Sequence, residues 1–149
     1  RHLVEWQVRQ FSQRLLQRLV SDFGVGLELR LGFLQRVDLG HERIGFIIGN
    51  PEQVASGQRL EGYRSAMRDA GLAIDEGLIA QGQFTYRSGM VAAEKLLGAP
   101  KPPTAIFASN DDMAAATVAM AHRRHLDVPN DVTVCGFDDT ELASSIWPE

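Results

Sequence analysis

The chain alternates short apolar runs with longer stretches in which apolar residues recur at helical spacing. The apolar runs are rich in β-branched and aromatic side chains and poor in charge, which is typical of strands buried inside a parallel sheet. These expected strands cover residues 43–48, 78–80, 104–108 and 132–137. Helices are expected between them, over residues 56–70, from an N-cap at Thr85 to Leu97, and from a cap at Asp111 or Asp112 to about Arg124.

A strand followed by a helix, repeated with short connections, predicts the α/β fold class. Such alternation implies a parallel sheet with helices on both faces and right-handed crossovers. The pattern runs from about residue 43 to 145, where Thr140 is expected to cap a last short helix. Residues 1–38 differ, because they predict only an amphipathic helix over 3–20 and a strand over 25–33. We therefore expect two segments, 1–38 and 39–149.

Polar and aromatic side chains gather where these strands end. The carboxyl ends of parallel strands share one edge of the sheet, which is where α/β proteins bind ligands. An arginine, an aromatic ring, an amide and carboxylates together suit a small polyhydroxylated ligand, whose hydroxyls pair with the polar groups while its apolar face stacks on the ring. Asn and Asp after a strand are also ordinary helix caps. The candidates are Arg59, Phe84, Asn110 and Asp138, with Asp111 and Asn50 as secondary ones.

Composition limits the classes of partner. The chain has 149 residues, enough for one core, and a net charge of −4, which argues against this segment gripping a phosphate backbone by itself. Residues 1–38 hold six Arg and four acidic residues, a balance more typical of a solvated helix face than of a nucleic-acid patch. The single cysteine, Cys135, rules out an internal disulfide and is expected to be buried. No apolar run approaches the ~18 residues of a membrane span.

Three other chemistries have less support in the residues. The acidic pairs after the third and fourth strands suggest Mg²⁺ and a metal-dependent enzyme, but no phosphate-binding glycine loop accompanies them. His122 and His125 have metal-ligand spacing, yet they stand at a basic helix end, where cations complement the helix dipole. Ser56 has no histidine base placed for it, which argues against a serine nucleophile. We therefore expect no metal, no cofactor and no enzymatic activity.

Four sequence blocks stand in a specific order and spacing. They are Gly40-His41-Glu42-Arg43-Ile44-Gly45, Arg59-Leu60-Glu61-Gly62-Tyr63, Ala108-Ser109-Asn110-Asp111-Asp112-Met113-Ala114 and Val128-Pro129-Asn130-Asp131-Val132-Thr133-Val134-Cys135-Gly136-Phe137-Asp138-Asp139. An aromatic residue, Phe84, also precedes a Ser88-Gly89 pair. Together these blocks resemble the lactose-repressor (LacI/GalR) family of bacterial transcription regulators, and the resemblance covers residues 39–149.

The resemblance implies a periplasmic-binding-protein-like fold of type I, in which a small-molecule effector binds in the cleft between two α/β lobes. This chain is similar to most of the C-terminal lobe, which we expect to be truncated. The family's effector contacts carry over onto Arg59, Phe84, Asn110 and Asp138, which the strand ends already selected. In the family, effector binding closes the lobes and shifts the DNA-binding heads. The family's helix-turn-helix is not recognisable in residues 1–38, so contact with DNA is expected only through another segment.

The resulting prediction is the effector-sensing domain of a LacI-type regulator, a cytoplasmic homodimer that binds a sugar or a purine-like molecule. The alternative is a periplasmic sugar-binding protein of a transport system, which has the same fold. The Asn-Asp-Asp-Met-Ala and Gly-Phe-Asp-Asp blocks favour the regulator.

Overall fold

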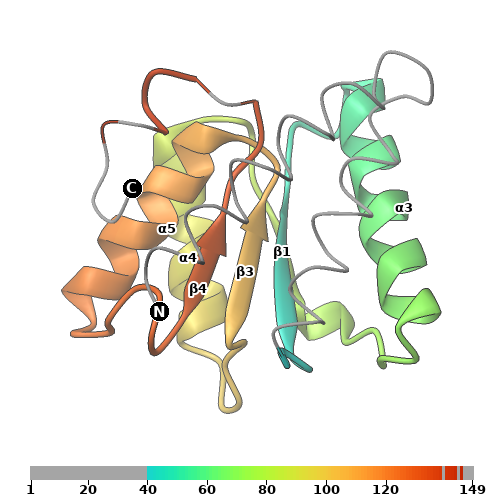
Figure 1. Ribbon diagram of the computed structural model, residues 1–149. Coiled ribbons are helices and arrows are strands. Elements are labelled where there is room, and N and C mark those ends of the chain that lie inside the picture. Colours follow the sequence, from blue (N-terminus) through green and yellow to red (C-terminus); the bar gives the residue numbers. More distant parts are fainter. Residues whose placement is uncertain (1–39, 139, 144, 146–149) are drawn as a thin grey trace.

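The computed structural model describes residues 40–138, 140–143 and 145 (Figure 1). The helix and strand expected within residues 1–38 therefore lie outside the described residues. Within those residues, strands and helices alternate as the sequence predicts. In chain order the elements are β1 (Ile44–Ile48), α3 (Val54–Asp69), the 3₁₀ helix η1 (Glu76–Leu78), β2 (Ile79–Gln81), α4 (Tyr86–Leu97), β3 (Ala105–Ala108), α5 (Asp111–Arg123) and β4 (Thr133–Cys135).

The four strands form one parallel sheet in the order β2-β1-β3-β4. β1 lies between β2 and β3, and its Phe46 aligns with Ile79 on one side and with Phe107 on the other. The chain goes from β1 to β2 in one direction and then crosses to β3 on the other side of β1. This reversal creates a topological switch point at the carboxyl ends of β1 and β3, which is where open α/β sheets bind ligands.

Alternate side chains of the strands fill two cores, one on each face of the sheet. On one face, Phe46 of β1 and Phe107 of β3 pack with Tyr63 of α3. On the other face, Ile47 and Ile106 join buried residues of α4 and α5. Figure 1 shows the same division, with α3 on one side of the sheet and α4 and α5 on the other. The expected α/β class, with helices on both faces of a parallel sheet, is confirmed.

Helices α4 and α5 approach closely because a glycine lies between them. A Cβ on Gly89 of α4 would lie 2.7 Å from the Cα of Met113 and 2.9 Å from the Cβ of Ala116, both in α5. The start of α4 is the expected one, since the hydroxyl of Thr85 accepts the backbone N–H of Ser88 at 3.2 Å in a capping box. The close packing sets the position of the first turn of α5, which follows β3 directly.

The cap of α5 differs from the sequence-based expectation. Asn110, rather than Asp111 or Asp112, caps the helix, because its Oδ1 accepts the backbone N–H of Met113 at 3.1 Å. Asn110 has the extended backbone of an N-cap residue, from which a short side chain reaches the N3 position. Asp111 is already the first residue of the helix, so its carboxylate is directed to other partners.

The last strand and the residues after it also differ. β4 ends at Cys135, earlier than expected, and the next residue, Gly136, lies so close to α5 that a Cβ there would be 2.5 Å from Oδ1 of Asp111. Cys135 is partly rather than fully buried, since it lies at this departure from the sheet. Residues 140–143 and 145 of the helix expected from Thr140 form turns, closed by a hydrogen bond from the N–H of Ala143 to the carbonyl of Thr140 at 2.9 Å, and the rest of that expected helix lies outside the described residues.

Candidate functional site

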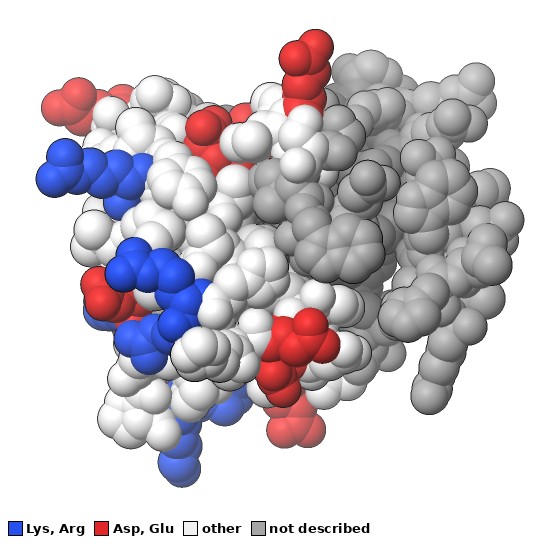
Figure 2. All heavy atoms as spheres, turned by 90° about the vertical axis from the view of Figure 1, so that its left-hand side faces the viewer, with Lys and Arg blue, Asp and Glu red and all other residues white. Residues whose placement is uncertain are grey.

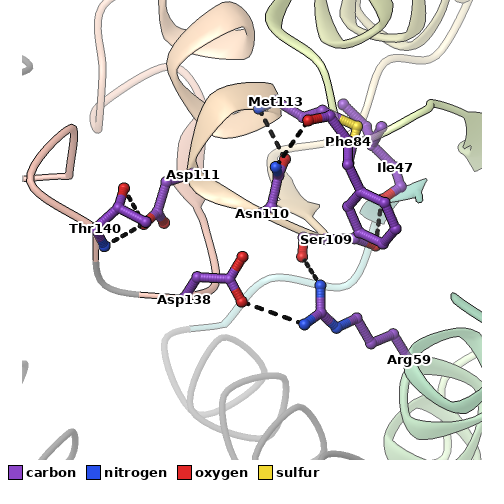
Figure 3. A network of polar contacts seen from close by, with 9 residues as sticks. All are labelled: Ile47, Arg59, Phe84, Ser109, Asn110, Asp111, Met113, Asp138 and Thr140. Carbon is purple, nitrogen blue, oxygen red and sulfur yellow. Dashed lines mark hydrogen bonds and ion pairs between the residues drawn. The ribbon is translucent and has the colours of Figure 1, made fainter. Parts of the chain in front are cut away.

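A buried arginine of α3 lies at the switch point of the sheet. Arg59 is 8% exposed, and its guanidinium donates one hydrogen bond to the backbone carbonyl of Ser109 and another to Oδ1 of Asp138 at 3.2 Å (Figure 3). Ser109 follows β3 and Asp138 lies beyond β4, so the arginine joins the ends of two neighbouring strands. A buried charge is costly unless it is paired and hydrogen-bonded, and these two acceptors meet that requirement.

Two aromatic rings lie near the guanidinium. The Cζ of Arg59 is 4.3 Å from the ring centroid of Phe137 and 5.4 Å from that of Phe84. At these distances a cation is attracted to the face of an aromatic ring. The Nε–H of Arg59 is buried and forms no hydrogen bond within the described part of the chain. Because buried donors are nearly always paired, this Nε–H needs an acceptor that the described residues do not provide.

Asp138 is the more accessible member of the ion pair. Its side chain is 42% exposed, against 10% for Arg59, so part of the carboxylate can meet a ligand while Oδ1 pairs with the arginine. Burial raises the pKa of Asp138 above the usual 3.8, and the charge and hydrogen bond of Arg59 oppose that rise. The negative charges of Asp111 and Asp112 raise the pKa further. Asp138 therefore changes charge at a higher pH than an ordinary aspartate.

Phe84 has an unusual backbone conformation that Asn110 stabilises. The φ angle of Phe84 is 61°, in the left-handed region that residues other than glycine seldom adopt. The Nδ2 of Asn110 donates to the carbonyl of Phe84 at 3.0 Å, while its Oδ1 caps α5. Asn110 is only 7% exposed and so fastens the loop before α4 to the first turn of α5. Figure 3 shows this amide bound to the backbone carbonyl of Phe84, which fixes the backbone that carries the ring.

The ring of Phe84 lies directly against Gly49, the residue after β1. A Cβ on Gly49 would lie 1.9 Å from the Cζ of Phe84, so Gly49→Ala is expected to push the ring away from Arg59. Because the ring is partly exposed and can rotate, the free energy of unfolding should fall by about 1 kcal/mol, the lower end of overpacking costs. The displacement is measured by NMR, as loss of the ring-current shift at the side-chain protons of Arg59, and stability by denaturant unfolding.

Gly57→Ala is the matched control for this substitution. Gly57 lies on the exposed side of α3, and a Cβ there would have nothing within 4 Å. This change is expected to stabilise the helix by about 0.5–1 kcal/mol and to leave the Arg59 resonances unchanged. Arg59 resonances that stay unchanged in Gly49→Ala as well would contradict the position of the ring.

The two secondary candidates are engaged with the protein itself. Asp111 is 5% exposed, and its Oδ2 accepts both the backbone N–H of Thr140 at 2.7 Å and the hydroxyl of Thr140 at 2.9 Å. The Oδ1 of Asn50 accepts the backbone N–H of Glu52 at 2.8 Å, which forms a turn after β1. Both residues lie at the expected edge of the sheet, but the arginine, the phenylalanine ring and the other carboxylate are the groups that face one another.

Sequence reasoning missed two contributors to this site. Phe137 provides the closer of the two rings beside Arg59, and the only sequence signal for it is its place before the aspartate of a recognised block. Ser109 contributes its backbone carbonyl, while its hydroxyl donates to the carbonyl of Ile47 at 2.7 Å. Every residue has a carbonyl, so no side-chain pattern could mark this role.

The remaining sequence-based candidates lie apart from the site. His122 and His125 are exposed at the end of α5. Ser56 is buried and donates its hydroxyl to the carbonyl of Asn50. Among residues 40–138 and the few described after them, no group of three His, Cys, Asp or Glu side chains is placed to hold a metal ion. No helix in this part of the chain is long and apolar enough to cross a membrane.

Comparisons with known proteins agree on one family. The family model for the periplasmic binding protein-like domain matches residues 35–149. The chain is 39% identical over 114 residues to catabolite control protein A of Priestia megaterium, a match that covers 76% of this chain and 34% of that protein. It is 43% identical over 109 residues to the HTH-type transcriptional repressor CytR of Escherichia coli K12, covering 73% of this chain and 32% of that protein.

A solved structure has the same fold. The complex of the transcriptional regulator CelR with cellobiose matches with a TM-score of 0.72 and 40% sequence identity. This match covers 75% of the chain and 34% of that structure. The chain thus spans about a third of the length of the relatives that it matches.

Proposed function

Because this chain belongs to the periplasmic binding protein-like domains of LacI-type transcriptional regulators, we propose that it senses a small-molecule effector for such a regulator. The observation that carries the proposal is the buried guanidinium of Arg59, paired with the half-exposed carboxylate of Asp138 at the switch point of the sheet. A structural arginine would not need an accessible carboxylate, a nearby ring and an unpaired Nε–H together. These groups are the ones that bind a small polar ligand.

A sugar fits these groups best. The Nε–H of Arg59 would donate to one ring or hydroxyl oxygen, and the exposed part of the Asp138 carboxylate would accept hydroxyl hydrogens. The ring of Phe84 would cover the apolar face of the sugar, and Asn110 would hold that ring in place. The CelR structure contains cellobiose, a disaccharide, which makes sugars the first ligands to test. Asn50 and Asp111 would act at the margin of the site through the loops that they hold.

We further propose that the regulator is a cytoplasmic dimer without enzymatic activity. In this proposal another segment of the regulator binds DNA. Figure 2 shows basic and acidic side chains scattered among uncharged residues over the described part of one face, on the side where α5 lies. Such a mixture of signs does not suit a phosphate backbone. Effector binding would then act on DNA affinity at a distance, by favouring one arrangement of the regulator over another.

A sugar-binding protein of a transport system is the second candidate. It would use the same strand edge and the same residues, so the binding site does not separate the two. The matched relatives described above are transcriptional regulators, which supports the first candidate. The two differ in one measurable property, since only the regulator changes its affinity for an operator when the sugar binds.

The proposal is tested by calorimetric titration of the protein with cellobiose, glucose, ribose and adenosine. Saturable binding of one of these compounds, lost in Asp138→Ala with the fold intact by circular dichroism, is the expected result. Because a ligand that binds only the folded state stabilises it, the same compound should raise the melting temperature of the protein. Absence of binding by all four would contradict these compounds as effectors that this lobe binds by itself. In a protein that also carries the DNA-binding segment, a sugar that binds but leaves the operator affinity unchanged would favour the transport alternative.

Sugar affinity is expected to fall as the pH is lowered through the raised pKa of Asp138. The ionised carboxylate accepts hydroxyl hydrogens, and protonation removes that capacity. The stability contribution has the opposite sign, because a raised carboxyl pKa gives stability that is present below the unfolded value and lost as pH rises. Lost binding at low pH is therefore not unfolding caused by this group. Titrations between about pH 4 and pH 7 measure the profile.

Asp138→Asn is the matched variant for the pH profile. The amide has nearly the shape of the carboxylate but does not titrate, so affinity should be lower and almost independent of pH over the same range. If sugar affinity in Asp138→Asn kept the wild-type pH dependence, a group other than Asp138 would be responsible for it.

A further inference from the structure

The carboxylate of Asp111 is buried and is bound to the loop that carries Asp138. Its Oδ2 accepts two hydrogen bonds from Thr140, from the backbone N–H at 2.7 Å and from Oγ1 at 2.9 Å. Figure 3 shows Asp111 turned toward Thr140 and away from Arg59. A carboxylate this well supplied with donors, and only 5% exposed, is a fixed anchor at the first turn of α5.

Asp138 lies between two attachments to that turn. On its N-terminal side, Gly136 approaches α5 so closely that a Cβ would lie 2.5 Å from Oδ1 of Asp111 and 3.0 Å from the Cβ of Ala114. On its C-terminal side, Thr140 binds Oδ2 of the same carboxylate. The two oxygens of Asp111 therefore meet the loop on both sides of Asp138.

The backbone of Asp138 needs such support. Its φ angle is 104°, in the region that non-glycine residues rarely adopt. Strained conformations of this kind persist only where the surrounding structure determines them. In this conformation Oδ1 of Asp138 pairs with Arg59 at 3.2 Å, although the side chain is 42% exposed. An exposed carboxylate on an unrestrained loop would gain little from holding one such ion pair.

We propose that Asp111 is a positioning residue that acts through Thr140 to hold Asp138 against Arg59, and that it does not contact the effector. The hydrogen bonds between Asp111 and Thr140, called the tether below, are present without a ligand. Only their role in effector sensing rests on the proposed function. Asp111 thus differs in role from Asp112, its exposed neighbour, although the two carry the same charge. The pair Asp111 and Thr140 sets the geometry, whereas Asp112 affects Asp138 only through the electric field.

Thr140→Val is the decisive variant, because it removes the hydroxyl donor, keeps the backbone N–H and changes no charge. Thr140 is exposed, so the protein should remain folded. The tether predicts that Asp138 moves away from Arg59, which normally lowers its pKa. The ¹³C shift of the Asp138 carboxyl carbon and the side-chain protons of Arg59 should therefore both shift. Thr140→Ser, which restores a hydroxyl donor, should return both signals toward the wild type.

Asp112→Asn is the matched control for charge. It removes a negative charge that raises the pKa of Asp138 but leaves the tether intact, so the pKa should fall and the Arg59 signals should stay in place. Wild-type values of both signals in Thr140→Val would overturn positioning through the hydroxyl of Thr140. Equal changes in Thr140→Val and Thr140→Ser would also overturn it, since both keep the backbone N–H but only serine keeps the hydroxyl. These measurements need no sugar, so a failure of the proposed function would not affect them.

Discussion

Arg59→Ala is expected to weaken sugar binding by about 100-fold, which corresponds to about 2.7 kcal/mol. The estimate lies at the lower end of the cost of truncating one partner of a buried, hydrogen-bonded charge pair. Three contacts disappear together: the hydrogen bond to the carbonyl of Ser109, the ion pair with Asp138 and the stacking on Phe137. The protein should remain folded, because the carboxylate of Asp138 is exposed enough to be rehydrated. Calorimetric titration measures the affinity, and circular dichroism verifies the fold.

Two further variants make the Arg59 result specific. Arg64→Ala removes another arginine of α3, one whose guanidinium forms an exposed pair with Glu76 at 2.9 and 3.0 Å, and affinity should not change. Arg59→Lys keeps the charge, but one ammonium cannot replace a planar group that bonds to two acceptors and lies on a ring. Lysine should therefore recover only a small part of the loss. Wild-type affinity in Arg59→Ala would remove the arginine from the binding site.

Tyr63→Ala is expected to lower the free energy of unfolding by about 3–5 kcal/mol, the range for truncation of a large aromatic residue in a core. Tyr63 has no exposed surface, and its ring is stacked on Phe46 with centroids 5.2 Å apart and an interplanar angle of 9°. Its hydroxyl donates to the carbonyl of Ile44 at 3.0 Å. This loss would be a large share of the ~5–15 kcal/mol typical of a domain. Urea unfolding measures it.

The hydroxyl of Tyr63 adds a pH dependence to the same residue. Burial, with the negative charges of Glu76 and Asp75, raises its pKa from 10.0 to about 12. The stabilisation is complete below the unfolded value and is lost as pH rises from about 10 to about 12, because the unfolded chain ionises first. Tyr63→Phe should cost about 1 kcal/mol at neutral pH and reduce this alkaline loss. Tyr86→Phe, at a residue 46% exposed, should change neither quantity.

The arrangement of the sheet follows from local patterns in the sequence. β1 and β3 are apolar on both faces, and only a parallel strand covered by helices on both sides buries such a run. Asp138 and Arg59 lie 79 residues apart, yet the rule that parallel strands end at one edge brings them together in the expectation and in the structure. The order of strands and helices along the chain is therefore enough to predict which strand ends meet.

The order of strands and helices does not predict the internal geometry of the site. Phe84 and Asp138 both have positive φ angles, and neither residue type predicts this conformation. Phenylalanine in particular seldom adopts it. The cap of α5 shows a second limit. Asn110 and Asp111 are both good capping residues by type, and only the exact start of the helix assigns the cap to Asn110 and the tether to Asp111. Helix ends are the least certain part of any pattern-based assignment.

The wide spacing of the site along the chain has a consequence for folding. Arg59 comes from the first α/β unit, whereas Asp138 follows the last strand of the described sheet. During synthesis, the arginine emerges long before its acidic partner, and a sheet that lacks β4 leaves the guanidinium without that counter-charge. Long-range pairings form late because their loop-closure entropy must first be overcome. The proposed sugar binding is therefore expected only in the completed fold, and a partly folded chain is expected not to respond to the effector.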